Sequence, residues 1–271
     1  MIHPRDLTPP RAEGEAVVTV RRRDGRDRLA RLRQQGSAKC LLPRRPGAPE
    51  AVLLNTAGGI TGGDRLRYTA GAEAGAALSV ATQAAERLYR APAEGPPGRM
   101  HVRLTVGPGA TLLWAPQETI AFDGARFHRR LEAEAAPDAR LLILESLVLG
   151  RTAMGERVAR AEIRDDWRVR RGGALVFADA LRLSGETEAA TGGPATFGGR
   201  IAAASLLYMA PDAEARLADA RAVLPETGGA SHWNGCLAIR ILAEDGQALR
   251  RHLMALLGAI APLPIPHVWT L

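Results

Sequence analysis

Residues 100–117 read MHVRLTVGPGATLLWAPQ, and the pattern of apolar side chains changes at the central Gly-Pro-Gly. Before the turn, apolar and polar residues alternate from Met100 to Val106, which is typical of a β-strand. After the turn, the run TLLW is apolar. The stretch therefore predicts a polar strand, a turn and an apolar strand.

The apolar half of this unit recurs, with starts separated by roughly 30 residues. The copies are GAALSVATQ at 75–83, GATLLWAPQ at 109–117, DARLLILES at 138–146 and GALVFADAL at 173–181. Alternating basic strands precede three of them, at 99–106, 125–135 and 157–171. Stacked units of this kind predict a mainly β fold with layered, helicoidal, β-solenoid-like sheets, and a plain antiparallel sandwich is the competing interpretation. The length suits one domain over residues 1–271.

Two α-helices are expected, both in the C-terminal quarter. Residues 211–223 are alanine-rich with apolar residues on one face, and Pro211 suits a first turn. Asp245 can cap a second helix that runs to about Gly258. The long polar stretch at 184–199 is interpreted as a binding loop that a partner orders.

The net charge is +7, and Lys39 is the single lysine among 36 basic residues. Arginine enrichment of this kind reflects either a GC-rich genome or a binding surface. Aromatic residues make up 4% and do not interleave the basic clusters, so nucleic-acid binding is disfavoured. No apolar run has the roughly 18 residues that a membrane span needs. The start, MIHPRDLTPPRAEGE, has no apolar signal-peptide core, so a cytoplasmic location is expected.

Residues 55–64, NTAGGITGGD, contain four glycines and end on an aspartate. The P-loop pattern GxxxxGK[ST] fails, because Asp64 and Arg65 stand where lysine is needed. The dinucleotide fingerprint fails as well, because no helix follows. The glycines are interpreted as a strand connection between 51–54 and 65–69.

The chain has no recognisable catalytic or stable metal signature. The six histidines lack HxH, HExxH or HxxxH spacing, and no GxSxG is present. The residues alone favour a binding or scaffold protein. The alternative is a β-solenoid carbohydrate-active enzyme that pairs two of the carboxylates Glu118, Glu145 and Glu156.

Several blocks in order resemble one family, the urease accessory proteins called UreD (UreH in some bacteria). The blocks are NTAGGITGGD at 55–64, TQAAERLYRA at 82–91, WAPQETIAFDGA at 114–125, LESLVLGRTAMGE at 144–156, WRVRRGGALVFAD at 167–179 and the ending PHVWTL. The loop at 184–199 and the N-terminal arm match no block, so no contacts there are carried over.

The resemblance implies a non-enzymatic maturation scaffold that binds apo-urease, UreF and the GTPase UreG. Nickel(II) would pass through transiently, with no tightly bound cofactor. The signature turn would comprise Asn55, Gly58, Gly59, Gly62, Gly63 and Asp64. A polar metal passage is hypothesised along Asp64, Gln83, Glu118 and Glu145, and Arg90 and Arg151 are candidates for partner docking. The competing interpretations are that Asp64 caps the turn and that Arg151 is a buried structural arginine.

Overall fold

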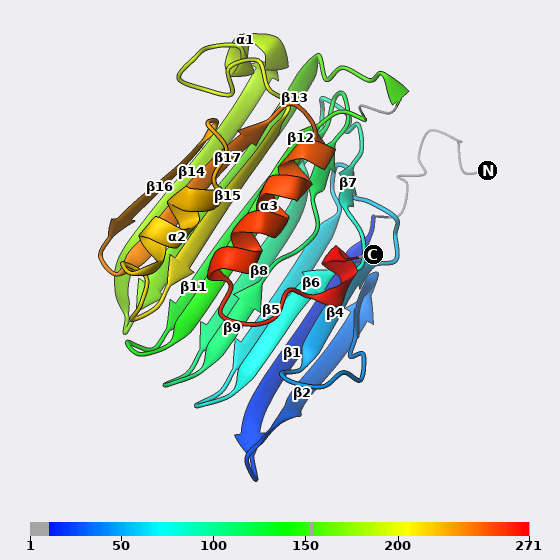
Figure 1. The fold of residues 1–271 in the computed structure, drawn as a ribbon. Coiled ribbons are helices and arrows are strands. Elements are labelled where there is room, and N and C mark those ends of the chain that lie inside the picture. The colour runs from blue at the N-terminus through cyan, green and yellow to red at the C-terminus, as the bar shows by residue number, and fades with distance from the viewer. Residues whose placement is uncertain (1–10, 152–153, 271) are drawn as a thin grey trace, which may run out of the picture.

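The computed structural model describes residues 11–151 and 154–270, and its strands form two sheets (Figure 1). The first sheet has seven strands in the order β14 (Ala174–Glu186), β13 (Arg160–Arg171), β11 (Arg126–Ala135), β8 (Gly98–Val106), β5 (Arg65–Ala72), β1 (Glu13–Arg23) and β2 (Arg26–Gly36). The second has ten. Its main path is β16 (Gly228–Trp233), β17 (Cys236–Ala243), β15 (Ala202–Met209), β12 (Arg140–Leu149), β9 (Thr111–Trp114), β6 (Ala77–Thr82), β4 (Glu50–Asn55) and β3 (Ala38–Leu41). Two short strands lie off this path: β10 (Thr119–Ala121) pairs with β12, and β7 (Glu86–Leu88) pairs with β10.

The centre of each sheet is parallel, because the chain alternates between the sheets. The apolar runs at 75–83, 109–117 and 138–146 form the neighbours β6, β9 and β12 of the second sheet. The preceding basic runs form β8, β11 and β13 of the first sheet. The fourth apolar run departs from the pattern, since it forms β14 and pairs antiparallel with β13.

The mainly β prediction is therefore confirmed, and the β-solenoid-like part is not. Neither sheet closes on itself or forms a solenoid, because antiparallel pairs end the parallel series on both sides. The antiparallel sandwich is also wrong, because the central pairs are parallel.

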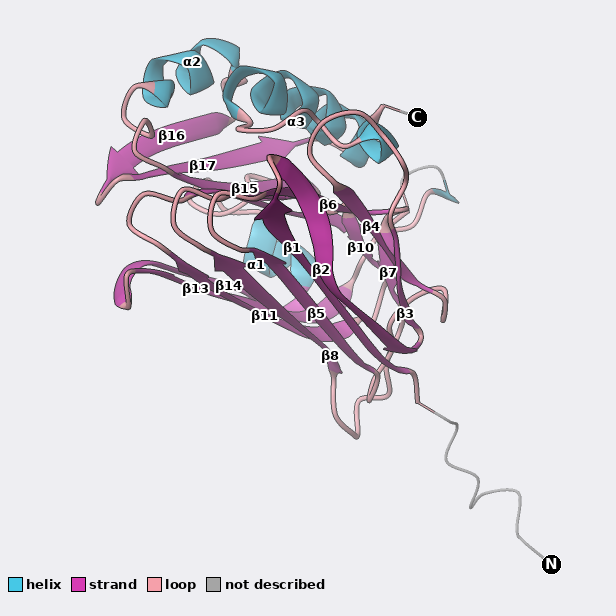
Figure 2. Cartoon of the chain, turned by 90° about the horizontal axis from the view of Figure 1, so that it is seen from below, coloured by secondary structure: helices cyan, strands magenta, loops and turns pink. Residues whose placement is uncertain are grey.

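The two sheets face each other across the main hydrophobic core (Figure 2). Alternation in β8 buries Met100, Val102 and Leu104 and leaves Arg99 and Arg103 outside, as a sheet with one wet face requires. By contrast, β12 is buried from Leu141 to Leu149, because its second face is covered as well.

Helices α2 (Arg216–Val223) and α3 (Gly246–Ile260) supply that cover on the outer face of the second sheet (Figures 1 and 2). Asp245 caps α3 as expected, since its Oδ1 accepts from the Ala248 N–H at 2.7 Å. Two helix boundaries are wrong. The turn before Arg216 delays α2, and α3 runs past Gly258 to Ile260 because its last turn is buried against the sheet.

The stretch at 184–199 is not a single loop. It contains the end of β14, the short helix α1 (Thr187–Thr191) and a series of turns. The C-terminal tail carries the 3-10 turn η3 (His267–Trp269), and Trp269 Nε1 donates to the Ala115 carbonyl at 2.8 Å. Within the described residues, no helix combines the length and apolarity needed to cross a bilayer. The start used for the signal-peptide expectation lies mostly outside the described residues, as does part of the block at 144–156.

Candidate functional site

The glycine-rich turn connects β4 of the second sheet to β5 of the first, so the strand connection is confirmed. Gly59 has a φ of 156°, and a Cβ there would lie 2.3 Å from the Tyr89 ring. Asn55 Nδ2 donates to the Gly59 carbonyl at 3.1 Å. The glycines therefore permit close backbone approach where the chain crosses between sheets.

Asp64 closes this turn with a buried carboxylate. It accepts from the backbone N–H groups of Ala12 and Thr61, each at 2.8 Å. The structure thus places Asp64 in the capping role that competed with the metal passage.

Replacing Asp64 by alanine is expected to lower the unfolding free energy by about 2 kcal/mol, because two N–H donors lose their acceptor. Asp64→Asn keeps one acceptor oxygen and should lose about half as much. Urea titrations of both variants measure the effect. An Asp64→Ala protein as stable as the parent would contradict the cap.

Beside this turn lies a hollow of about 320 Å³ lined by Asn55, Tyr68, Gln83 and Glu86. Gln83 is exposed at its rim. Glu86 accepts from Asn55 Nδ2 at 3.2 Å, and burial raises its pKa to about 7. The negative charge of Asp64 acts in the same direction, so these two carboxylates share one neighbourhood.

Glu86 predicts a pH dependence of stability. Because its pKa rises from 4.5 to about 7 on folding, the folded chain holds more protons between those values. Stability is therefore lost as pH rises from 4.5 through 7, by at most about 3 kcal/mol. Relative to the parent chain, Glu86→Gln should become more stable by up to that amount between pH 5 and 8 in urea titrations. Parallel pH profiles of the two proteins would contradict this.

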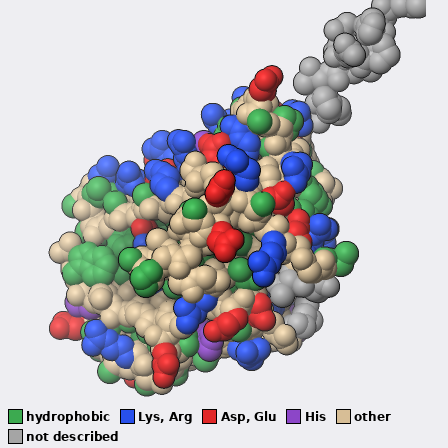
Figure 3. Space-filling model, turned by 90° about the horizontal axis from the view of Figure 1, so that it is seen from above, with side chains coloured by type: hydrophobic (Ala, Val, Ile, Leu, Met, Phe, Trp, Pro, Cys, Tyr) green, Lys and Arg blue, Asp and Glu red, His purple; other side chains and the backbone are tan. Residues whose placement is uncertain are grey.

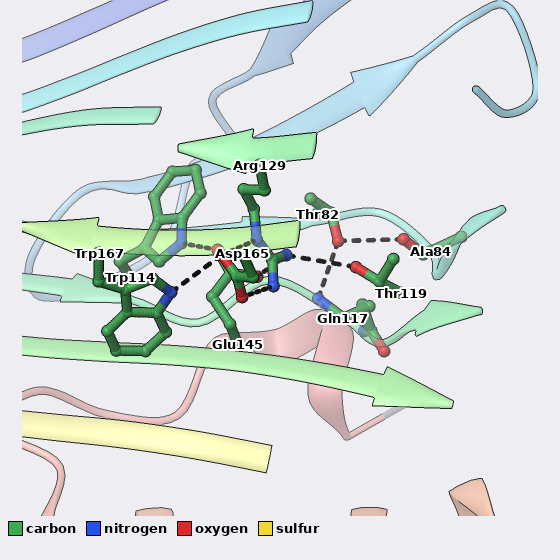
Figure 4. Close-up of polar contacts among 9 residues, drawn as sticks. All are labelled: Thr82, Ala84, Trp114, Gln117, Thr119, Arg129, Glu145, Asp165 and Trp167. Atoms are coloured by element: carbon green, nitrogen blue, oxygen red, sulfur yellow. Dashed lines mark hydrogen bonds and ion pairs between the residues drawn. The ribbon is translucent and has the colours of Figure 1, made fainter. Parts of the chain in front are cut away.

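An ionic cluster formed by Arg129, Glu145 and Asp165 lies between the sheets (Figure 4). Arg129 of β11 donates from Nε and Nη2 to Asp165 of β13, at 3.0 and 2.6 Å. Its Nη1 donates to Glu145 of β12 in the opposite sheet. Trp114 and Trp167 complete the cluster, with Nε1 donating to Glu145 at 2.9 Å and to Asp165 at 3.1 Å. The cluster therefore ties the two sheets together through charge.

Its charges do not balance when both carboxylates are ionised. Burial raises the pKa of Glu145 to about 7, and Asp165 acts in the same direction, while Arg129 and Trp114 oppose the rise. Burial alone would lower the pKa of Arg129, yet the two carboxylates raise it overall. Arg129 thus stays charged, and the cluster carries one excess negative charge whenever both carboxylates are ionised, which attracts a proton or a cation.

A second hollow, of about 460 Å³, adjoins the cluster. Glu145, Asp165 and Ser146 line it, and the buried Ser146 Oγ has no hydrogen-bond partner among the described residues. Polar groups lead from the first hollow toward this one. Thr82 Oγ1 accepts from the Gln117 N–H at 2.9 Å, and Thr119 Oγ1 accepts from Arg129 Nη1 at 3.4 Å (Figure 4).

The proposed passage residues are therefore only partly brought together. Glu118 turns away from the cluster, because its carboxylate pairs with Arg250 of α3 at 3.2 Å. Its backbone carbonyl nevertheless accepts from the Glu86 N–H at 2.9 Å, beside the first hollow.

The two arginines predicted for docking lie near the partly buried ring of Phe122. Arg90 pairs with Asp123, and Arg151 stacks over Phe122 with its guanidinium carbon 4.3 Å from the ring centre. The Arg151 side chain is 46% exposed, so its interpretation as a buried arginine is wrong.

Paired catalytic carboxylates receive no support from the geometry. Glu118, Glu145 and Glu156 each bind a different arginine: Arg250, Arg129 and Arg151 respectively. Within 11–151 and 154–270, no three His, Cys, Asp or Glu side chains gather to hold a metal ion.

The sequence analysis missed Arg129, Asp165 and Glu86. A usable indication existed for the first two. In β11, Arg129 stands at an inward position between Phe127 and Leu131, and in β13 Asp165 stands between Ile163 and Trp167. A charge on the apolar face of a strand must be paired when it is buried.

Comparison with known proteins shows one consistent likeness. The family model described as UreD urease accessory protein matches residues 12–270. Proteins named "Urease accessory protein UreD" are similar along nearly their whole length. The one from Xanthobacter autotrophicus is 47% identical over 262 residues, covering 96% of this chain and 90% of that protein. Those from Methylobacterium sp. (strain 4-46) and Agrobacterium fabrum are 45% and 43% identical, covering 98% and 96% of this chain and 98% and 92% of the relatives.

Proposed function

We propose that this chain, which belongs to the UreD family of urease accessory proteins, is a maturation scaffold. It binds apo-urease, UreF and the GTPase UreG, and it helps deliver nickel(II) to the urease active site. The family membership, which the blocks at 55–64 and beyond predicted, carries the proposal. UreD is an accessory family and not a catalytic one. The carbohydrate-active alternative is not supported. The expected cytoplasmic location stays a prediction.

Nickel is the cargo of this scaffold, and we assign its path to the polar groups between the two hollows. Glu86 and the rim residue Gln83 lie at one end, with the charge of Asp64 nearby. Glu145 and Asp165 lie at the other end. The threonine and backbone groups between them offer oxygen atoms (Figure 4).

Oxygen groups suit transit better than storage. Carboxylates and carbonyls bind a divalent ion of this row more weakly than histidine or cysteine does, so the ion can leave again. Arg129 keeps the net charge of the inner end small, which limits how tightly a cation is held there. Glu118 takes part through its backbone next to Glu86, while its side chain fastens α3.

Partner docking is assigned in part to the exposed group around Phe122. Arg90 and Arg151 present guanidinium groups there, beside Tyr89, whose ring lies 5.2 Å from that of Phe122. Exposed arginine and aromatic side chains in contact are frequent anchors of protein interfaces.

The test is urease activation by co-expression. A related urease operon is expressed with nickel, with and without this gene, and urea hydrolysis is assayed together with the amount of urease protein. Collapse of activity with normal accumulation of apo-urease is the expected result. Unchanged activity would overturn the proposal.

A further inference from the structure

The outer face of the first sheet carries basic side chains directly opposite one another. Arg65 of β5 pairs in register with Arg99 of β8, and Arg99 pairs with His128 of β11. His128 pairs with Arg164 of β13, which in turn faces Arg182 of β14. One row across five neighbouring strands is therefore basic throughout.

A second row lies two residues further along each strand. Arg67 of β5 pairs with His101 of β8, and His101 pairs with Arg130 of β11. The two rows line a hollow of about 560 Å³, in which Asp166 is the acidic residue. We call this surface the basic groove and define it by Arg65, Arg67, Arg99, Arg130, Arg164 and Arg182, all of which are exposed.

The groove is only partly neutralised by the protein itself. Arg130 pairs with Glu132 at 2.5 Å and Arg182 with Asp166 at 2.6 Å. Arg65 and Arg164 have more distant partners, Glu13 and Glu162, each at 3.8 Å. Among the described residues, Arg67 and Arg99 have no acidic partner within ion-pair distance. Like charges directly opposite each other on a sheet cost stability. When no contact within the protein offsets this loss of stability on an exposed face, the surface typically serves binding.

We infer that the basic groove docks an acidic segment of a protein partner. The groove is bounded, because β1 places Glu13 and Glu15 opposite Arg65 and Arg67, and Asp166 closes the other side. At a strand spacing of about 4.8 Å, the uncompensated part is only a few strands wide. That width matches one short acidic segment. Its carboxylates would form ion pairs with the groove arginines, as Glu132 and Asp166 already do.

Other occupants fit less well. Among the described residues, no Phe, Tyr or Trp lines the hollow, whereas nonspecific single-stranded nucleic-acid sites stack bases on such rings. A second copy of this chain, placed with the same face, would bring like charges together. The end of the molecule seen in Figure 3 offers a contrast, because acidic and basic side chains are interspersed there. The inference rests on strand register and charge. It is therefore independent of the proposed role in nickel delivery, and either can be wrong while the other is right.

The test measures binding of a fluorescein-labelled oligoglutamate peptide to the full chain by anisotropy at low salt. The variant Arg67→Glu/Arg99→Glu should lose about tenfold or more in affinity. The matched control Arg45→Glu/Arg251→Glu changes the net charge equally at exposed positions outside the groove, and should lose less than about twofold. The groove variant should unfold near the temperature of the parent, because Arg99→Glu removes a like-charge contact with Arg65 while Arg67→Glu places a carboxylate opposite Glu15.

Three outcomes would overturn the inference. The first is equal loss in the groove variant and the control, which would mean that net charge alone attracts the peptide. The second is tighter binding of a labelled oligothymidylate, which would assign the groove to nucleic acid. The third is no binding of oligoglutamate by the parent chain. Should the charge reversal fail to fold, Arg67→Gln/Arg99→Gln provides the same comparison with a smaller expected loss.

Discussion

Replacing Arg129 by methionine is expected to lower the unfolding free energy by about 3–5 kcal/mol. The substitution removes the one cation of the buried cluster and leaves Glu145 and Asp165 facing each other without a counter-charge. The Arg129 and Glu145 side chains are only 6% and 3% exposed, so water cannot compensate for the loss. Chemical denaturation of the purified variant measures the effect.

Arg130→Met is the matched control, because Arg130 is the neighbouring residue but points outward with a 64% exposed side chain. It should change stability by less than about 0.5 kcal/mol. The triple variant Arg129→Met/Glu145→Gln/Asp165→Asn removes all three charges together and should recover most of the loss, since no unpaired charge remains. An Arg129→Met protein as stable as the parent would show that the cluster does not hold the sheets together.

The same triple variant is expected to reduce urease activation by more than about tenfold in the co-expression assay, a barrier change of at least about 1.4 kcal/mol. It keeps the size of the side chains but removes the negative charge at the inner end of the proposed nickel path. Apo-urease should accumulate normally, and the variant should still bind its partners in pull-downs. Loss of activation with these two readouts intact identifies transport, and not folding, as the affected step.

Arg251→Met serves as the control here, because Arg251 is exposed and lies outside both the path and the basic groove, and it should activate urease like the parent chain. Added nickel should partly rescue the triple variant if transport is slowed, because a higher nickel concentration offsets a weaker attraction of the cation. Full activation by the triple variant at low nickel would overturn the path through Glu145 and leave the family membership untouched.

Local patterns were sufficient to predict many of the strands and the family. Alternation in 100–106 and the apolar runs at 77–82, 111–114 and 140–149 reflect which side chains face the core, and this depends on the period of a strand. The Asp245 cap depends on atoms three residues apart, so it was also predictable. The blocks from NTAGGITGGD onward identified the family without any knowledge of contacts.

The candidate site was less predictable, because its partners are distant in the chain. Glu145 was chosen as a candidate, but its pairing with Arg129 joins strands of opposite sheets. Glu118 was chosen on the same grounds and proved to pair with Arg250, more than 130 positions away. No spacing rule in the sequence places either glutamate beside its arginine.

The sequence by itself determined that the alternating and apolar runs are strands, that two late segments are helices, and which family the chain belongs to, because each depends on short-range periodicity or on residue identity. It did not indicate β2, β15 or the short helix α1. Only the tertiary structure decided that the repeated units divide between two open sheets, and that Arg129, Glu145 and Asp165 meet between them. It also decided that the basic strands align their arginines in one groove. The physical reason is that strand register and sheet packing arise from long-range burial, which brings together side chains whose separation in the sequence carries no record of their contact.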